Sequence, residues 1–339
     1  NLEEHFINLT DKDIKNNTIK LPVNRSLYLN ELLKKFKTTK TTKNSEYKDL
    51  IENLEKDNLD EQIEIPNSIK ATLRDYQKIG FKWLETLDNY KFGGILADDM
   101  GLGKTIQILS IILAYVNESK ENRKTSIVIS PSSLALNWLQ EASKFAPSLK
   151  VGVVSGKASE RKQQIENLEK NDLIITSYDL LKRDSEKYEE KNYSFKYIIA
   201  DEAQYLKNSK TQNAKSIKSL KGETRFALTG TPIENSLAEL WSIFDFIMPG
   251  YLFQYKKFKN SYESPKVREA NSIVNVVADK FNFISQKANF NDAVNDPEQG
   301  VREEDIDNVM SQLHRGVYGD ELITLLKLMV KAIFEHQTT

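Results

Sequence analysis

The chain has 339 residues, 39% of them apolar and 29% charged, which allows one large domain or two ordinary ones around a real core. Its formal net charge of −1 excludes a globally basic protein, so nucleic-acid binding would need a local basic surface. The absence of cysteine excludes disulfides and thiolate metal sites and fits a reducing cytosol, and the three histidines are too far apart to predict a zinc site. We recognise no signal peptide and no apolar run of membrane length, and the first residue, Asn1, suggests a piece of a longer product.

The first 66 residues are polar and rich in lysine. Apolar side chains recur at helical spacing over 29–36 and over 47–54, and residues 37–45 between them have the composition of a solvated linker. We predict a small helical preface over residues 1–66, packed on the main domain. A separate binding module is the alternative.

From Ile69 onward, short β-rich runs alternate with helical segments. The runs lack internal polar alternation, which is typical of an α/β fold with a parallel sheet and helices on both faces. Ligands of such sheets bind beyond the carboxyl ends of the strands. The expected strands are 94–97, 126–130, 151–155, 173–177, 197–200 and 225–228, and a helix that opens over 73–77 should bury Tyr76, Ile79, Trp83, Leu84 and Leu87.

The stretch 93–107, GGILADDMGLGKTIQ, has the order of a strand, a glycine-spaced turn and a helix. In such a loop, backbone N–H groups and the helix N-terminus face an anion. Lys104 would reach the β- and γ-phosphates of a nucleotide, and the Thr105 hydroxyl would bind magnesium. The strict pattern G-x-x-x-x-G-K-[ST] fails, because Asp98 occupies the position of its first glycine. The flanking strand and helix still predict a nucleotide-phosphate site, with the loop residues Asp99, Met100, Gly101, Leu102 and Gly103.

An acidic pair, Asp201 and Glu202, follows the apolar run 197–200 and begins the sequence DEAQ, which ends at Gln204. At the end of a strand, such a pair can place Asp201 on magnesium, usually through water, and Glu202 beside the attacking water. An acidic pair can also serve only as a helix cap. Its position at a strand end, in a chain that already carries a phosphate loop, favours the catalytic interpretation.

The segment 228–235, LTGTPIEN, also leaves an expected strand. The small residues Thr229, Gly230 and Thr231 could sense a γ-phosphate and pass that information to another surface. A tight turn, ahead of a helix that begins near Ser236, explains the same residues. Taken alone, the pattern favours the turn.

Hydroxyl residues gather after two further strands. Hydroxyls and free N–H groups at helix N-termini suit the phosphate oxygens of a nucleic-acid backbone. Helix capping explains Ser133 equally well, and Trp138 is expected to pack at the sheet edge. The candidate backbone contacts are Pro131, Ser132, Ser133, Thr176, Ser177 and Tyr178.

Taken in order, LRDYQ (73–77), ADDMGLGKT (97–105), PSSLALNW (131–138), ITSYDLL (175–181), DEAQ (201–204) and LTGTPIEN (228–235) form a consistent series. The series resembles the Swi/Snf-type ATPases, a branch of the superfamily-two helicases, and is most similar to their bacterial members. The resemblance continues through ELWSIFDFIMPGYL at 239–252, reaches weakly upstream over 20–66, and stops near residue 265.

The resemblance implies a RecA-like lobe of a double-stranded-DNA translocase that hydrolyses ATP with magnesium. It implies that Gln77 contacts the adenine with Arg74 nearby, and that Lys104 and Thr105 bind the phosphates and the metal. Such proteins hold the DNA backbone rather than a sequence, so DNA binding should weaken steeply with salt.

The resemblance also implies roles for the later motifs. Asp201, Glu202 and Gln204 would form the catalytic set, with Asp201 serving the metal and Glu202 acting as the base. The hydroxyl residues at 131–133 and 176–178 would hold one DNA strand. The turn at 229–231 would couple the state of the nucleotide to that grip.

Residues 266–339 depart from the family pattern. A complete motor has two RecA-like lobes, and the second supplies arginine fingers worth about three to five powers of ten in rate. The arginine-rich segment and the Q-x-x-x-R-x-x-R motif expected next are not found. The tail carries 8 Lys/Arg and 12 Asp/Glu, with helical apolar patterns. It is open whether it is a fused module, a truncation product or an engineered tail, and it is a candidate binding segment for a protein partner.

These observations predict the ATP-binding lobe of a DNA-dependent ATPase, with low turnover unless a second lobe comes from the parent protein or in trans. The alternative is a non-catalytic nucleotide- and DNA-binding module whose helical tail recruits a protein partner. A nuclease-associated or RNA helicase subunit is a third hypothesis, which the wording of DEAQ and LTGTPIEN disfavours. We expect a cytoplasmic, nucleoid-associated protein with no membrane partner.

Overall fold

The computed structural model of the chain describes residues 14–15, 18–19, 42–45, 47–48, 63–98, 101–119, 123–230, 236–252 and 254–262. The chain divides into two units, Asn1–Asp57 and Asn58–Thr339. In the first unit, β1 (Ile14–Lys15) pairs antiparallel with β2 (Thr18–Ile19). The predicted preface is therefore not purely helical. Its two amphipathic segments lie largely outside the described residues, as do all the helices predicted within 266–339.

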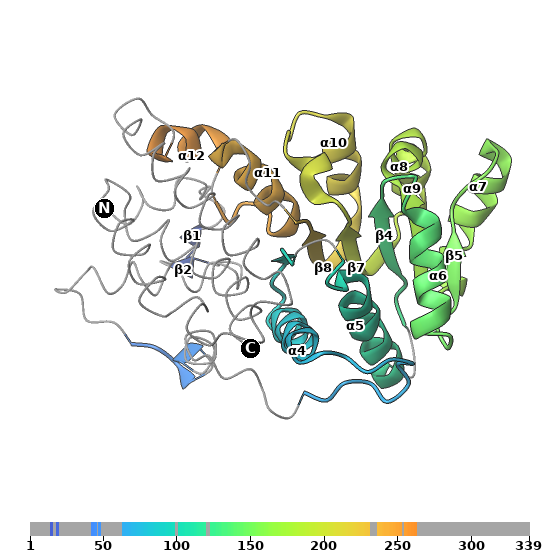
Figure 1. Ribbon diagram of the computed structural model, residues 1–339. Helices are drawn as coiled ribbons and strands as arrows, with labels where there is room; N and C mark the ends of the chain where they lie inside the picture. The colour runs from blue at the N-terminus through green and yellow to red at the C-terminus, as the bar shows by residue number, and fades with distance from the viewer. Residues whose placement is uncertain are drawn as a thin grey trace. The chain divides into compact units, whose positions relative to one another are not determined.

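The second unit is built on a six-stranded sheet in which every neighbouring pair of strands is parallel (Figure 1). The order across the sheet is β3-β8-β7-β4-β6-β5. This confirms the predicted α/β fold, and each expected strand is present. The strands are β3 (Gly94–Leu96), β4 (Ser126–Ser130), β5 (Val151–Val153), β6 (Leu173–Ser177), β7 (Ser194–Ala200) and β8 (Lys221–Leu228).

Helices form two groups by their contacts: α4, α5 and α6 pack side by side, and α8, α10 and α11 form a second group with η3. Right-handed crossovers between parallel strands place these groups on opposite faces of the sheet. Among the described residues, no helix is both long and apolar enough to cross a membrane. The helices are α4 (Asp75–Asn89), α5 (Lys104–Glu118), α6 (Ala135–Phe145), α7 (Ala158–Glu166), η2 (Leu168–Lys170), α8 (Tyr178–Arg183), α9 (Ser185–Lys191), η3 (Ala203–Leu206), α10 (Gln212–Ser219), α11 (Leu237–Ile247) and α12 (Tyr255–Tyr262).

Helix α5 is the most deeply buried helix of the described chain. Nine consecutive residues, 106–114, are buried, so its middle turns have no solvent-facing side. A helix that is apolar all round belongs inside a protein, which matches the predicted apolar run at this point. Because α5 begins at Lys104, this buried helix also fixes the end of the phosphate loop.

The buried face of α4 differs from the predicted one. Phe81 and Leu84 are fully buried, and Gln77 and Asp88 lie on the same buried face. Three residues of the predicted face, Tyr76, Ile79 and Trp83, are only partly buried. The helix is rotated relative to the prediction because Gln77 and Asp88 make polar contacts inside the molecule, and apolar spacing alone does not reveal such contacts.

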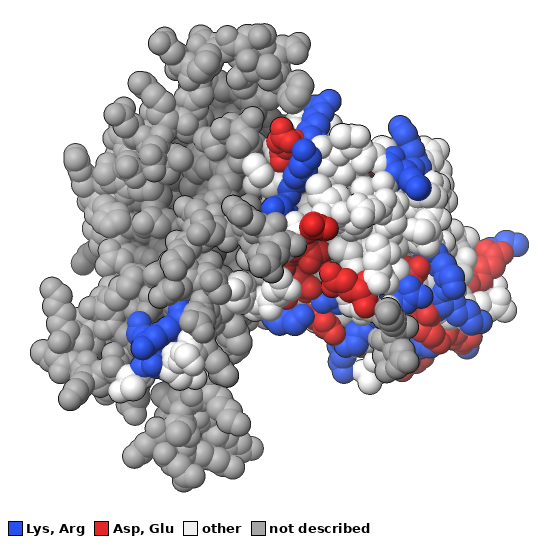
Figure 2. Space-filling model, turned by 90° about the horizontal axis from the view of Figure 1, so that it is seen from below, with Lys and Arg blue, Asp and Glu red and all other residues white. Residues whose placement is uncertain are grey.

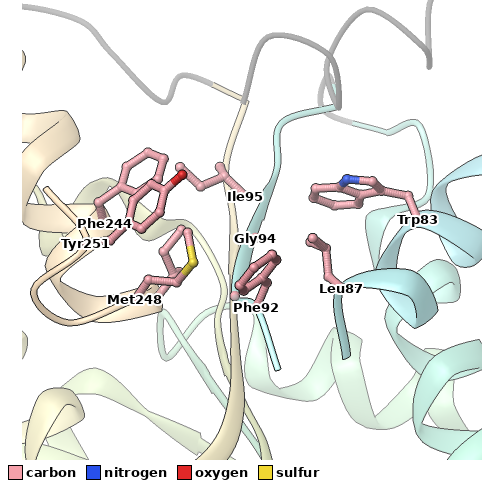
Figure 3. Close-up of a pocket in the computed structure, with 10 residues that line it drawn as sticks. Trp83, Leu87, Phe92, Gly94, Ile95, Phe244, Met248 and Tyr251 are labelled. Carbon is pink, nitrogen blue, oxygen red and sulfur yellow. The ribbon is translucent and has the colours of Figure 1, made fainter. Parts of the chain in front are cut away.

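Strand β3 forms one edge of the sheet and borders an apolar pocket between α4 and α11 (Figure 3). Gly93 precedes the strand, and a Cβ added there would collide with the carbonyl oxygen of Ile247 at the end of α11. The missing side chain therefore lets α11 approach the edge strand. Described residues that line the pocket include Trp83, Leu87, Phe92, Phe244, Met248 and Tyr251.

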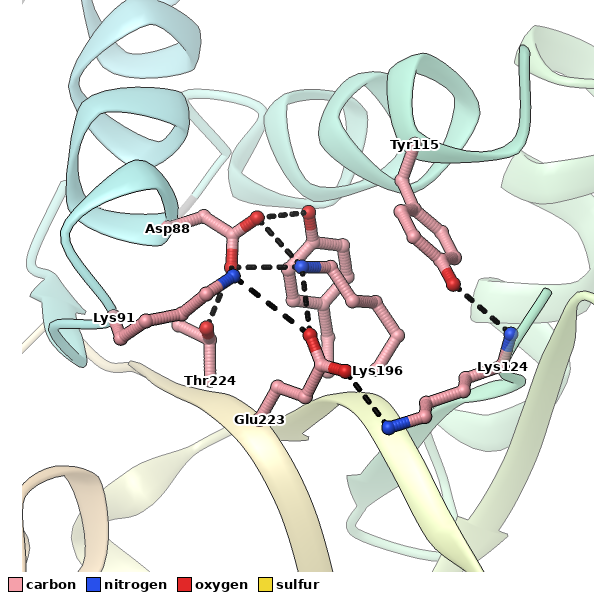
Figure 4. A network of polar contacts seen from close by, with 8 residues as sticks. Asp88, Lys91, Tyr115, Lys124, Lys196, Glu223 and Thr224 are labelled. Atoms are coloured by element: carbon pink, nitrogen blue, oxygen red, sulfur yellow. Dashed lines mark hydrogen bonds and ion pairs between the residues drawn. The ribbon is translucent and has the colours of Figure 1, made fainter. Parts of the chain in front are cut away.

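A buried polar network lies near the amino ends of β7 and β8, at the opposite end of the sheet from the carboxyl ends of the strands (Figure 4). The Lys196 ammonium donates to both oxygens of Asp88, at 3.0 and 2.7 Å, and to Glu223 at 3.2 Å. Tyr197 and Thr224 donate hydroxyl hydrogen bonds to the same Asp88 carboxylate, at 3.1 and 2.6 Å. The network joins α4 to the neighbouring strands β7 and β8.

Candidate functional site

Except for Arg74 and Gln77 at the start of α4, the polar residues of the predicted motifs lie at or just after the carboxyl ends of β3, β4, β6, β7 and β8. All these strands are parallel, so their carboxyl ends meet at one edge of the sheet.

The phosphate loop has the backbone that its glycines predict. Gly101 and Gly103 adopt φ of 84° and 82°, a left-handed conformation that residues with a side chain rarely adopt. No atom of the described residues lies within 4 Å of a Cβ built on Gly101, so that part of the chain leaves open space beside the loop. Lys104 and Thr105 are the first two residues of α5, and the Lys104 ammonium donates to the carbonyl oxygen of Asp98 at 2.6 Å. Asp99 and Met100 lie outside the described residues.

Helix α4 supports this loop from one side. The Gln77 side-chain amide donates to the Leu102 carbonyl oxygen at 3.0 Å, and the Tyr76 hydroxyl donates to the same oxygen at 2.9 Å. The Gln77 carbonyl oxygen accepts from the backbone N–H of Arg74 at 3.0 Å. Gln77 thus joins the start of α4 to the phosphate loop, and its contact with adenine stays a prediction.

Asp98 has a structural role that the sequence pattern did not reveal. Its carboxylate accepts a hydrogen bond of 2.8 Å from the Gln107 side chain, which is fully buried in α5. Gln107 lies three residues after Lys104, so this bond closes the loop across its base. The Asp98 carboxylate thus ties the loop to α5 from the position where the strict pattern has a glycine.

Asp201 follows the central strand β7 and is held from several sides. Its carboxylate accepts from the indole N–H of Trp138 at 2.8 Å and from the backbone N–H of Glu202 at 3.0 Å. Its backbone carbonyl oxygen accepts from the Tyr178 hydroxyl at 2.9 Å. Burial raises the pKa of Asp201, the hydrogen bond from Trp138 and the charge of Lys104 oppose that rise, and the charge of Glu202 adds to it.

Glu202 and Gln204 form a hydrogen-bonded chain with Thr229. The Gln204 amide donates to the Glu202 carboxylate at 2.7 Å, and the Thr229 hydroxyl donates to the Gln204 carbonyl oxygen at 3.2 Å. Glu202 has φ of 50°, and a residue with a side chain held in this region stores strain, which is typical of functional sites. Thr229 is fully buried, whereas Thr231 lies outside the described residues. The DEAQ motif and the turn after β8 are therefore in direct contact.

The predicted DNA contacts fall into two groups. Ser132 and Ser133 are exposed and Pro131 is half-buried. Ser133 does not cap the following helix, because the N-cap position of α6 is Leu134 and no side chain caps it. Contact of residues 131–133 with a DNA backbone remains a prediction.

The second group is buried instead. The exposed fractions of Thr176, Ser177 and Tyr178 are 1%, 4% and 3%. The Ser177 hydroxyl caps α8 by accepting from Leu180 N–H, and the Tyr178 hydroxyl bonds Asp201. These hydroxyls are engaged inside the protein, which the sequence did not reveal, and their contact with DNA also stays a prediction.

Trp138 is buried and has a partner that the sequence did not reveal. It is 2% exposed, and its indole N–H donates to Asp201, the residue that follows β7 at the edge where the carboxyl ends of the strands meet. Nothing in the spacing of PSSLALNW indicates that bond, because its partner lies 63 residues away.

The side chains at this edge fit a magnesium nucleotide. An ammonium (Lys104), a hydroxyl (Thr105) and a buried carboxylate (Asp201) are the groups that bind phosphate and magnesium. Open space beside Gly101 leaves room for a ligand at the loop. A neutral or cationic ligand would not explain a helix N-terminus and a lysine at the same place.

Comparison with known proteins agrees with this chemistry. The family model of the SNF2-related domain matches residues 76–338, and that of the bacterial SNF2 helicase-associated domain matches residues 5–66. The first match passes residue 265, where the resemblance in motifs stops, and the second covers most of the predicted preface.

Relatives with similar sequences include an uncharacterised ATP-dependent helicase of Mycoplasma genitalium, 42% identical over 61% of this chain and 20% of the relative. The putative ATP-dependent helicase/translocase YwqA of Bacillus subtilis is 43% identical over 58% of the chain and 21% of its own length. The TATA-binding protein-associated factor MOT1 of Saccharomyces cerevisiae is 41% identical over 61% of the chain and 12% of its length. The chain thus spans about a fifth or less of these relatives.

Among solved structures, the SWI2/SNF2 ATPase core of Sulfolobus solfataricus in complex with double-stranded DNA is similar, with a TM-score of 0.56 and 33% identity. The match covers 79% of this chain and 59% of that one. The parallel sheet agrees with this structure, and the SNF2-related family model spans both the phosphate loop and the DEAQ segment. The chain belongs to the SNF2-related family.

Proposed function

We propose that this chain is the ATP-binding lobe of a DNA-dependent ATPase that translocates on double-stranded DNA. The observation that carries the proposal is the hydrogen-bonded chain that joins the DEAQ segment to the turn after β8, at the same edge of the parallel sheet as the phosphate loop. The family supports ATP as the substrate, and the solved relative's complex with double-stranded DNA supports duplex DNA as the partner.

Each residue of the site has one part in this function. When ATP binds, the Lys104 ammonium would leave the Asp98 carbonyl oxygen, 2.6 Å away, for the more strongly attractive phosphate oxygens. Thr105 and Asp201 would hold magnesium, which supplies charge neutralisation on the phosphates when bound. Glu202, oriented by the Gln204 amide, would take the proton of the attacking water. Positioning and charge stabilisation are most of what phosphoryl transfer needs.

The contact of Gln204 with Thr229 links this chemistry to another part of the lobe. A change at Glu202 on binding or hydrolysis would reach Thr229 through two hydrogen bonds. This supports a coupling role for residues 229–231. We expect low turnover from the chain alone, because the arginine fingers of such motors come from a second lobe.

DNA binding is expected at local surfaces rather than over the whole lobe. On the face shown in Figure 2, described Lys and Arg side chains are interspersed with Asp and Glu, so that face has no broad positive field. If the contacts are to phosphates, the logarithm of the DNA-binding constant should fall linearly as the logarithm of the salt concentration rises. The slope should be the same for any DNA sequence. Two duplexes of unrelated sequence, titrated at several salt concentrations, test this part.

Binding of a non-hydrolysable ATP analogue to the 339-residue chain in magnesium tests the nucleotide site. Lys104→Ala should abolish binding, because the loop then lacks its cation. Lys162→Ala, which removes an exposed lysine of α7, is the matched control and should bind as the unaltered chain does. Equal affinity of Lys104→Ala and the control would refute the phosphate-loop assignment.

Steady-state ATP hydrolysis with and without duplex DNA separates the motor from its alternative. Stimulation by DNA supports a motor lobe that obtains a second lobe in trans. Binding of nucleotide and DNA without turnover, even when a second RecA-like lobe of the family is supplied, would instead support a non-catalytic module whose residues 266–339 recruit a partner.

A further inference from the structure

The bond between Trp138 and Asp201 is the basis of a further inference. The indole N–H is only a donor, and it points at one carboxylate oxygen of Asp201 at 2.8 Å, with both side chains buried. A hydrogen bond to an ionised carboxylate in a site shielded from water is strong and directional. The second carboxylate oxygen accepts from Glu202 N–H, so the rotation of this side chain is fixed at both oxygens.

The main chain of Asp201 is held separately. Its N–H donates to the Ile129 carbonyl oxygen in β4 at 2.8 Å, and its own carbonyl oxygen accepts from Tyr178. Tyr178 in turn stacks on Tyr205, with ring centroids 5.1 Å apart and planes 8° apart. Losing the indole bond would therefore leave the carboxylate held at one oxygen only, while its backbone stays in place.

Trp138 lies in α6, a helix that packs against Asp201 on one side and is exposed to solvent on the other. Helix α6 starts directly after the turn at 131–134, where Ser132 and Ser133 are exposed. Leu136, two residues before Trp138, is 66% exposed. A ligand bound to this turn or to the first turn of α6 contacts the same helix that holds Trp138, so it can shift the indole relative to Asp201.

We propose that Trp138 is a positioning residue through which DNA contact at the start of α6 reaches the Asp201 carboxylate and sets its affinity for magnesium. The proposal rests on the proposed function, because it takes Asp201 as a magnesium ligand and residues 131–133 as a DNA contact. Hydrogen bonds that orient metal ligands typically contribute 10–100-fold to metal affinity or activity.

The test uses Trp138→Phe in the 339-residue chain and measures binding of the ATP analogue at increasing magnesium concentration. We expect the magnesium concentration for half-maximal tight binding to rise about 10–100-fold, with nucleotide affinity in EDTA unchanged. Trp241→Phe is the matched control, since this buried tryptophan packs on Tyr255 in α12. A tryptophan that only fills space would lower thermal stability in both variants without moving the magnesium profile.

The same titrations are repeated with a saturating DNA duplex. In the unaltered chain, duplex should lower the magnesium requirement, and in Trp138→Phe this shift should disappear. If Trp138→Phe does not fold, β-(3-benzothienyl)alanine at position 138 replaces the N–H by sulfur and keeps the ring shape, and it is expected to behave in the same way.

An unchanged magnesium profile in the folded variant, or an equal DNA shift in variant and unaltered chain, would overturn the inference. Failure of the proposed function looks different: the unaltered chain itself would then show no magnesium-dependent nucleotide binding.

Discussion

Glu85 on α4 gives a prediction about pH and stability. Its Oε1 atom is buried and has no hydrogen-bond partner among the described residues. Burial raises the pKa of Glu85 from 4.5 to about 7, the charges of Asp88 and Glu118 add to the rise, and Lys196 opposes it. The folded state thus keeps a proton on this carboxyl group where the unfolded chain has lost it.

The size of the effect follows from linkage. Because the folded pKa is the higher one, the free energy of unfolding falls as the pH rises from about 4.5 to about 7 and stays at its lower level above that. One pKa unit corresponds to about 1.4 kcal/mol, so the ionised Glu85 costs on the order of 3 kcal/mol above neutral pH. Glu85→Gln removes this cost and keeps the shape of the side chain.

Urea unfolding at pH 5 and pH 8 measures the effect. Glu85→Gln should be more stable than the unaltered chain by up to about 3 kcal/mol at pH 8, and close to it at pH 5. Glu190→Gln, at an exposed position of α9, is the control and should give the same difference at both pH values. A pH-independent difference for Glu85→Gln, or a loss of stability at pH 8, would refute the reasoning.

Three further substitutions test other parts of the structure. Gly103→Ala puts a Cβ on a residue with φ of 82° and within 2.5 Å of the Gln77 amide nitrogen. The loop should therefore distort, at a cost of about 1–3 kcal/mol, and lose affinity for the ATP analogue. Unchanged affinity would contradict the loop geometry. Glu202→Gln should retain ATP binding and lose any hydrolysis in the presence of duplex DNA, and retained turnover would show that another group is the base. Lys196→Met leaves the buried Asp88 carboxylate with the more distant Lys91 ammonium, 3.8 Å away, and should lower the free energy of unfolding by about 3–5 kcal/mol. A urea titration would detect this loss, and an unchanged midpoint would show that Lys91 and the hydroxyl partners suffice.

Much of the fold could be predicted because parallel strands that are buried on both faces appear in the sequence as short, continuous apolar runs. The runs at 126–130 and 173–177 coincide with β4 and β6, residue for residue. Strands β7 and β8 begin three and four residues earlier than expected, because their first residues are polar and the apolar run starts later. The phosphate loop was equally clear, since Gly101 and Gly103 have the left-handed backbone that their spacing implies.

The hydrogen bonds between polar side chains that are distant in the sequence could not be predicted. Gln77 and Asp88 lie on the buried face of α4, where apolar periodicity predicts Tyr76 and Trp83. Similarly, the bond from Trp138 to Asp201 joins two motifs that are far apart in the chain. Such contacts depend on which strands are neighbours, and a single sequence does not give that order.

The continuous burial of α5 has a consequence for hydrogen exchange. Amides over 106–114 sit in a helix with no exposed side, so they can exchange with solvent only when the whole lobe unfolds. Gly101, three residues before Lys104, borders open space instead, and its amide needs only a local opening. Lys104 therefore stands at the boundary between a slowly and a rapidly exchanging segment, and a ligand held by the loop would slow exchange on one side of that boundary alone.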